Sequence, residues 1–175
     1  MTNNIHIRPE TEADWGEVYE IHTAAFGKTD EADLVDRLRE QVPPYISLVA
    51  TNGQDPQAPI VGHIMFTPVT IPEHPQAKIA GLAPVGVTPK LHKQGIGKAL
   101  ILAGLEQCQA AGYGAVILIG HPSYYPRFGF KPGSQLGLSS TYDVPDEVFM
   151  ALELEPGYLT PFSGKAHYHP AFEGV

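Results

Sequence analysis

The chain has 175 residues, of which 43% are hydrophobic and 17% charged, a composition typical of one globular domain with a real core. No apolar run approaches the roughly 20 residues of a membrane span, and the opening stretch MTNNIHIRPETEAD lacks the pattern of a secretory signal. The net charge of −8 argues against nucleic acid as a partner, and the single cysteine, Cys108, fits a reducing compartment. We therefore expect one cytoplasmic domain over residues 1–175 that binds neither nucleic acid nor membranes.

The first elements are a short strand and two helices. IHIR at 5–8 alternates as a strand does, and Thr11 with Asp14 then resembles a helix N-terminal cap. The helix that follows places apolar residues at helical spacing, starting from Trp15, which we expect in the core, and it ends at Gly27. A second amphipathic helix is predicted from about residue 31 to residue 41.

The next two elements read as a β-hairpin. Residues 45–51 (YISLVAT) and 60–71 (IVGHIMFTPVTI) are rich in β-branched and aromatic side chains. Between them, NGQDPQAP at 52–59 consists of residues that favour turns. The pattern predicts two antiparallel strands joined by this loop.

A strand–helix–strand unit follows. KIAGLAPVGV at 78–87 and the continuous apolar run at 115–120 are predicted strands, and a helix with apolar periodicity runs between them from about Gly95 to Ala111. Such a unit predicts parallel pairing with a right-handed crossover. Further on, a helical turn at 124–128 and a strand at 148–154 precede an irregular tail rich in Pro, Gly and aromatic residues.

The segment KLHKQGIGKAL, residues 90–100, has the features of an anion-binding loop at a helix N-terminus. A Walker loop would need Ser or Thr after Gly97-Lys98, where this chain has Ala99, and a dinucleotide fingerprint would need a third glycine where it has Leu100. A simpler design needs only unpaired backbone N–H groups, the helix dipole and nearby lysines. That design can hold a pyrophosphate without a metal; a glycine-rich turn without a ligand is the structural alternative.

Several motifs together resemble the GNAT superfamily of N-acetyltransferases. LAPVGVTPKLHKQGIGKALI is similar to that family's acetyl-CoA-binding segment, in which Gln or Arg precedes a Gly by three residues and a Gly or Ala by five. YYPRFGF is similar to its Tyr-x-x-x-Gly-Phe element. GHIMFTPV, FMALELEPG and YHPAF resemble a bacterial group of N-acetyltransferases whose acceptors are mostly undefined. The resemblance implies an α/β (α+β) fold with a mixed, mostly antiparallel sheet that has a central split and flanking helices.

The resemblance also implies a donor site for acetyl-CoA as cosubstrate, with no metal. The residues that it assigns to this site are Val85 and Val87 on the preceding strand and His92, Lys93, Gln94, Gly95, Ile96, Gly97 and Lys98 in the loop. His92 departs from the expected Gln or Arg. A histidine contacts phosphate more strongly when it is protonated, so this departure predicts that affinity depends on pH.

For catalysis, the resemblance assigns Tyr125 as the general acid that protonates the leaving thiolate, since it lies four residues before Gly129-Phe130. Three candidates remain open for contact with the acceptor amine or for the base: Glu31, His63 and His121. We expect the acceptor to be a small-molecule or peptide amine. The aromatic, proline-rich tail could dock on a partner subunit, so a homodimer stays among the alternatives. The competing interpretation is a non-catalytic acyl-CoA-binding module or sensor on the same fold.

Overall fold

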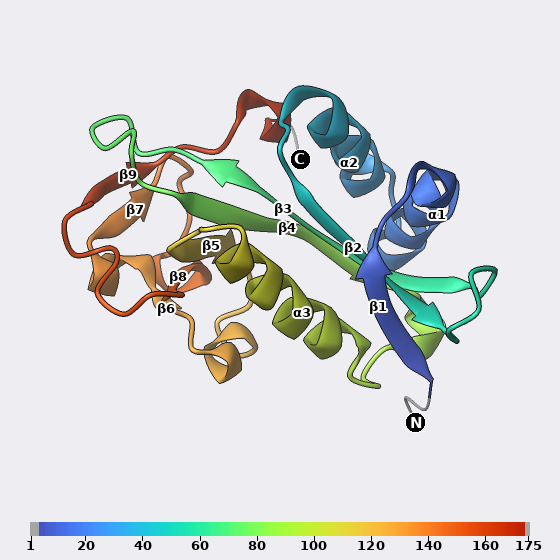
Figure 1. The fold of residues 1–175 in the computed structure, drawn as a ribbon. Coiled ribbons are helices and arrows are strands. Elements are labelled where there is room, and N and C mark those ends of the chain that lie inside the picture. Colours follow the sequence, from blue (N-terminus) through green and yellow to red (C-terminus); the bar gives the residue numbers. More distant parts are fainter. Residues whose placement is uncertain (1–3, 174–175) are drawn as a thin grey trace. The chain divides into compact units, whose positions relative to one another are not determined.

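The computed structural model describes residues 4–173 and has an α/β architecture built on a seven-stranded mixed sheet (Figure 1). The strand order is β1-β2-β3-β4-β5-β8-β6, and β7 and β9 form a separate parallel pair. The strands are β1 (Ile5–Pro9), β2 (Ile46–Asn52), β3 (Ile60–Val69), β4 (Ile79–Val87), β5 (Ala115–Ile119), β6 (Lys131–Pro132), β7 (Leu138–Ser140), β8 (Phe149–Glu153) and β9 (Gly164–Ala166). The helices are α1 (Trp15–Phe26), α2 (Asp30–Gln41) and α3 (Ile96–Ala110).

The strand pairings confirm the expected mixed, mostly antiparallel sheet. β1 pairs with β2, β2 with β3, β5 with β8 and β6 with β8, all antiparallel, so the predicted hairpin is confirmed. β4 and β5 pair in parallel from Ile79 to Gly81, which confirms the predicted strand–helix–strand unit. β4 then continues for a further six residues to Val87.

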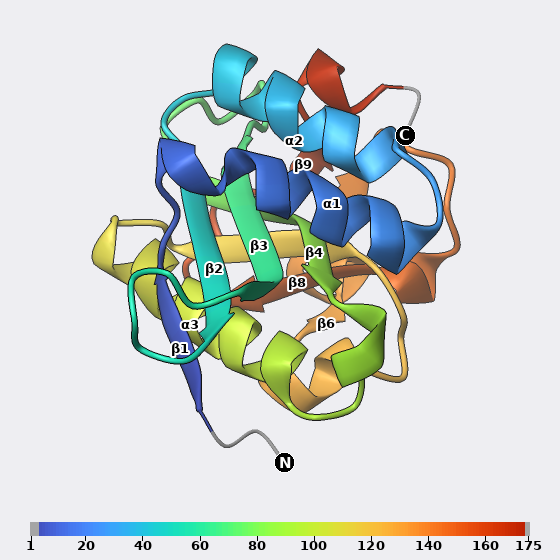
Figure 2. The same cartoon turned by 90° about the vertical axis from the view of Figure 1, so that its right-hand side faces the viewer.

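The contacts of the chain group it into two compact units. The first comprises residues 1–67, 83–106 and 171–175, and the second comprises residues 68–82 and 107–170. In the first unit, α1 and α2 cover one face of the strands and α3 covers the other (Figures 1 and 2). The expectation of a single domain over residues 1–175 stays a prediction.

The start and end of α1 follow local backbone chemistry. The Thr11 N–H donates to Asp14 Oδ2 at 2.7 Å, and a single 3-10 turn, Glu12–Asp14, leads into the helix. Gly27 ends the helix with φ of 72°, a left-handed conformation that glycine adopts without a steric cost. Trp15 was expected in the core, but 37% of it is exposed, and its ring stacks on the Arg39 guanidinium at 4.8 Å.

Two glycines let α3 pack closely on the sheet within the first unit. A Cβ on Gly62 of β3 would lie 2.9 Å from Leu100 Cδ1 and 3.2 Å from Ile96 Cγ2. A Cβ on Gly104 of α3 would lie 2.2 Å from Cε1 of Phe66, a β3 residue that is 1% exposed. The missing side chains therefore set the distance between helix and strand, and with it the position of the helix N-terminus.

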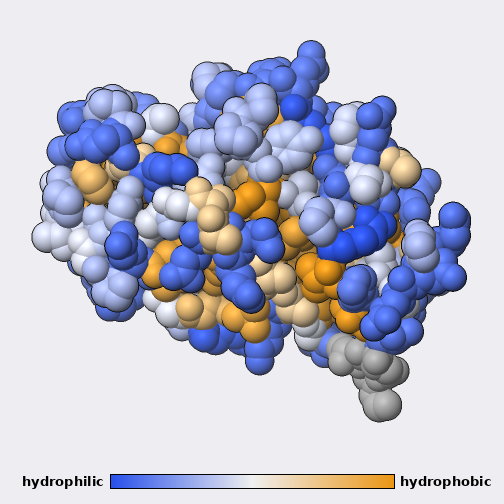
Figure 3. Space-filling view, viewed as in Figure 1, coloured by the Kyte–Doolittle hydropathy of each residue, from blue (hydrophilic) through white to orange (hydrophobic). Residues whose placement is uncertain are grey.

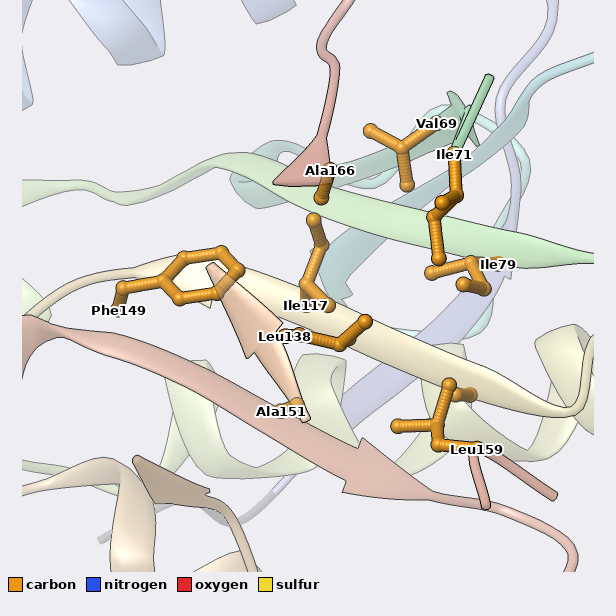
Figure 4. Packing of buried hydrophobic residues seen from close by; sticks show 10 residues of the cluster. Val69, Ile71, Ile79, Ile117, Leu138, Phe149, Ala151, Leu159 and Ala166 are labelled. Atoms are coloured by element: carbon orange, nitrogen blue, oxygen red, sulfur yellow. The ribbon is translucent and has the colours of Figure 1, made fainter. Parts of the chain in front are cut away.

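The second unit has its own apolar core (Figure 4). Its members come from β3, β4, β5, β7, β8 and β9 and from the segments after β3 and β8: Val69, Ile71, Ile79, Ala115, Ile117, Leu138, Phe149, Ala151, Leu159 and Ala166. Three short strands in this unit, β6, β7 and β9, were not predicted, because two or three residues are too few to show a strand period.

The helices of residues 4–173 are all too short or too polar to cross a membrane. The face of the molecule in Figure 3 is mainly hydrophilic with scattered apolar groups. Leu102 on α3, which is 48% exposed, is among the large apolar side chains that reach the surface. Single exposed apolar residues are ordinary for a folded protein.

Candidate active site

The glycine loop of the first unit lies between the end of β4 and the start of α3. A 3-10 turn, Pro89–Leu91, follows the strand, and its bonds are Leu91 N–H to Thr88 O at 2.9 Å and His92 N–H to Pro89 O at 3.3 Å. Lys93 then has a φ of 64° and Gly95 a φ of 84°. Two left-handed residues so close together turn the backbone sharply into the helix.

This turn leaves a run of backbone donors without partners. Ala99 N–H donates to Gly95 O at 3.0 Å, as in a first helical turn. Within residues 4–173, the N–H groups of positions 93–98 donate to no backbone carbonyl. Lys93 and Lys98 are exposed beside them, while Ile96 is only 2% exposed and anchors the helix in the core. The loop therefore presents N–H groups, a helix dipole and two cations to an anion.

The end of β4 presents a second set of backbone groups. Thr88 N–H donates to Val61 O at 2.9 Å, and Gly86 O lies 3.3 Å from the position of a Cβ on Gly62, so Gly86 and Thr88 face β3. Since the polar groups of neighbouring strand residues point to opposite sides, those of Val85 and Val87 face the other edge. The Val87 carbonyl on that edge accepts a hydrogen bond from His92 Nε2 at 2.9 Å.

Beneath α1 and α2, the first unit holds a buried polar network. Arg39 binds the Glu10 carboxylate with two hydrogen bonds of 2.6 and 3.1 Å, and the side chains of this ion pair are 5% and 3% exposed. His63 Nε2 lies 2.7 Å from Ser47 Oγ and 3.5 Å from Glu10 Oε1. His63 Nδ1 lies 2.7 Å from His22 Nε2. His63 is 0% exposed with both ring nitrogens engaged, which leaves neither nitrogen for an acceptor.

The network ends at the strand that carries Val85 and Val87. His22 Nδ1 is buried and has no hydrogen-bond partner among the described residues, and it would lie 2.7 Å from a Cβ on Gly86. The His22 ring thus fills the space of a missing side chain on β4. Burial and then the nearby Arg39 charge lower the pKa of His22 to about 4. Burial, His22 and Arg39 lower the pKa of His63, so both rings are neutral at neutral pH.

Glu31 lies in the first turn of α2, also in the first unit. Its side chain is half-buried, and its Oε1 atom is shielded from solvent without a hydrogen-bond partner in residues 4–173. A buried carboxylate oxygen without a partner is costly unless a cation or donor completes it. The first turn also holds Asp30, which pairs with Lys28 at 3.2 Å, and Asp33, which accepts from Tyr19 at 2.7 Å.

Tyr125 belongs to the second unit, at the start of a 3-10 turn, Tyr125–Phe128. Its ring packs over Gly120, where a Cβ would lie 2.5 Å from Cε2, and against Phe130 at 5.9 Å between centroids. Burial and the neighbouring Tyr124 raise the pKa of Tyr125 to about 12. Gly129, with φ of 98°, ends the turn. The motif thus holds a protonated phenol in a largely apolar setting.

Tyr124 has different surroundings from its neighbour. Arg127 lies over its ring at 4.4 Å and donates from Nε to its carbonyl at 2.8 Å. The rings of Tyr124 and Tyr125 meet edge to face, with an interplanar angle of 84°. The two phenol rings are therefore oriented differently. His121, just after β5, is exposed and accepts from the Tyr124 N–H through its carbonyl at 3.1 Å.

Comparison with known proteins decides the family. A model of the acetyltransferase (GNAT) domain matches residues 6–133. The chain belongs to the GNAT acetyltransferase family. Among GNAT relatives, it is 34% identical over 164 residues to the uncharacterized N-acetyltransferase YjhQ of Escherichia coli, covering 89% of this chain and 87% of YjhQ. It is 30% identical over 166 residues to the uncharacterized N-acetyltransferase YhbS of the same organism, covering 95% and 97%.

Solved GNAT structures share the fold over nearly the whole chain. E. coli YhbS in complex with CoA superposes with a TM-score of 0.88 at 29% identity, covering 97% of this chain and 92% of YhbS. A GNAT family acetyltransferase from Brucella melitensis in complex with acetyl-CoA superposes with a TM-score of 0.78 at 33% identity, covering 97% and 99%. The predicted family and fold are therefore confirmed.

Sequence reasoning missed the buried network. Glu10 lies directly after β1, and the other members lie on two helices and two strands: His22 on α1, Arg39 on α2, Ser47 on β2 and His63 on β3. No local motif joins them, and only the pairing of three strands under two helices brings them together. No group of three or more His, Cys, Asp or Glu in residues 4–173 is placed to hold a metal.

Proposed function

We propose that this protein is an acetyl-CoA-dependent N-acetyltransferase that moves the acetyl group directly to a primary amine. The observation that carries the proposal is the run of unpartnered backbone N–H groups at positions 93–98, at the N-terminus of α3. Membership of the GNAT family supports it, as do the CoA and acetyl-CoA complexes of two similar proteins.

The donor would be held by backbone groups in two places. The N–H groups of the loop, together with Lys93 and Lys98, suit the pyrophosphate, which needs donors and positive charge in no fixed geometry. The outward edge of β4 suits the pantetheine arm, an amide-containing chain that can bond to strand backbone. On that edge, Val85 offers both its N–H and its carbonyl, and Val87 offers its N–H, because His92 takes its carbonyl.

The transfer itself needs one bond made and one broken. The amine nitrogen attacks the thioester carbonyl carbon, the C–S bond breaks, and the amine loses a proton. We propose Tyr125 as the group that donates a hydrogen bond and then its proton to the departing sulfur; the proton lost by the amine restores the phenol. Its raised pKa keeps it protonated at neutral pH.

Among the candidates for contact with the acceptor, we propose Glu31, because its shielded Oε1 atom lacks a hydrogen-bond donor. Its shielded Oε1 would be completed by an ammonium or another N–H donor of the acceptor. His121 is exposed at the end of β5 and stays a candidate base, since a neutral imidazole can take a proton. His63 is enclosed in the buried network between Ser47 and His22, so we do not propose it for direct contact with the acceptor.

The test compares Tyr125→Phe with Tyr124→Phe as a matched control. We expect Y125F to bind CoA normally and to lose about 10²- to 10⁴-fold in kcat with any amine that the wild type acetylates, the usual range for a general acid. Y124F keeps its turnover, because that ring carries no proposed proton. Equal turnover in Y125F and wild type would remove Tyr125 from the mechanism. CoA binding without turnover on a broad amine panel would favour the non-catalytic acyl-CoA-binding module.

A further inference from the structure

His92 lies at the junction between β4 and the glycine loop. The 3-10 turn Pro89–Leu91 reverses the chain, and His92 leaves it in an extended conformation, with φ of −61° and ψ of 149°. From there its ring returns to the end of the strand, where Nε2 lies 2.9 Å from Val87 O. Because a carbonyl oxygen can only accept, Nε2 must carry the proton of this bond. The His92 side chain is thus hydrogen-bonded to the end of β4.

The bond joins two parts of the chain that must keep a fixed spacing. On one side is the outward edge of β4 with Val85 and Val87. On the other side, immediately after His92, the backbone turns through Lys93 at φ of 64°, and the unpartnered N–H groups begin. A lysine with positive φ is strained, so this turn needs support from its neighbours. The backbone N–H of His92, which donates to Pro89 O at 3.3 Å, supplies such support at the first residue before the turn, and it does not depend on the side chain.

We propose that His92 is a positioning residue: its Nε2–H clasps the end of β4 to the loop and so fixes the spacing between the groups that hold pantetheine and those that hold pyrophosphate. The proposal rests on the proposed function. In this proposal, the unexpected histidine acts through its hydrogen bond to the Val87 backbone carbonyl, and it does not contact the phosphate. It also explains why glutamine can serve at this position, since the amide nitrogen of Gln stands close to where Nε2 of His stands.

A matched pair of variants tests the clasp. Gln places an N–H donor near the Nε2 position, whereas Asn places its donor near Nδ1 and cannot reach Val87 O. The bond is exposed and its net worth is modest, so H92N should bind CoA about 3- to 10-fold more weakly than H92Q in calorimetric titrations. Equal affinities of H92N and H92Q would overturn the proposal.

ADP separates the clasp from a direct phosphate contact, because ADP has a diphosphate but no pantetheine arm. A spacing defect affects only a ligand that spans loop and strand, so H92N should lose affinity for CoA and keep the wild-type affinity for ADP. A parallel loss on both ligands would show that His92 contacts phosphate and would overturn the clasp.

The tautomer of the His92 imidazole tests the bond to Val87 independently, without any ligand. In nitrogen-detected NMR of the free protein with labelled histidine, His92 should show a protonated Nε2 and a bare Nδ1 at slightly alkaline pH. A protonated Nδ1 would contradict the bond to Val87. If the wild type shows the Nε2–H tautomer but binds no CoA, the proposed function fails while the clasp stands.

Discussion

The buried His22–His63 pair predicts that acid destabilises this protein well before its carboxylates are titrated. Both imidazoles are 0% exposed and lie 2.7 Å apart through Nε2 and Nδ1. Their folded-state pKa values are lowered, that of His22 to about 4, whereas an unfolded chain has an imidazole pKa of about 6.5. Above pH 6.5 both states hold neutral rings, so the pair adds no pH dependence there.

As pH falls below 6.5, the unfolded state takes up protons that the native state does not, so the free energy of unfolding falls. For His22, the gap of about 2.5 pKa units is worth about 3 kcal/mol, reached near pH 4. His63 adds loss in the same direction. About 3 kcal/mol is a large share of the 5 to 15 kcal/mol of an ordinary domain.

Urea unfolding followed by fluorescence between pH 7.5 and pH 4.5 measures this slope. We expect His22→Asn to reduce the slope of the unfolding free energy against pH by the equivalent of about one proton. His6 is an exposed histidine of β1, and His6→Asn should leave the slope as in the wild type. Should H22N fold poorly, NMR titration of the wild-type rings still decides: the pKa of His22 should be about 4, and that of His63 should lie well below the usual 6.5. A wild-type stability that stays constant from pH 6.5 to 4.5 would refute the reasoning.

Three substitutions probe packing by urea unfolding at pH 7.5. Glu10→Gln leaves Arg39 without its buried carboxylate and should cost about 3 kcal/mol, and a loss under 1 kcal/mol would show that the pair is not coupled. Gly104→Ala places a Cβ where Phe66 already stands and should cost about 1 to 3 kcal/mol. Gly16→Ala in α1, where a Cβ would meet nothing within 4 Å, should instead stabilise by about 0.5 to 1 kcal/mol; the same sign for both glycines would contradict the packing argument.

The long elements could be predicted because their patterns are local. The helix expected at 31–41 is α2, Asp30–Gln41, and its expected apolar face is buried at Leu34, Val35 and Leu38. Trp15 could not be placed from its type alone. A helix face that is apolar by spacing can still reach solvent at its first residue, and a stacked guanidinium covers this ring.

The backbone of the glycine loop could be predicted better than the surroundings of the acceptor candidates, for a physical reason. Backbone N–H groups at a helix N-terminus depend on the chain conformation over a few residues, which glycine spacing indicates. The environment of an acidic or imidazole side chain depends on residues far along the chain. His63 illustrates this: it was a candidate for contact with the acceptor, and the structure encloses it between Ser47 and His22.

The most direct test of the central claim is acetyl transfer by the wild-type protein. Purified protein, acetyl-CoA and a panel of primary amines are incubated, with released CoA followed by a thiol reagent and the N-acetyl product by mass spectrometry. We predict equal amounts of free CoA and of the acetylated amine with at least one amine, and no release without protein. Failure of the protein to bind acetyl-CoA, or CoA release without any acetylated amine across the panel, would contradict the account.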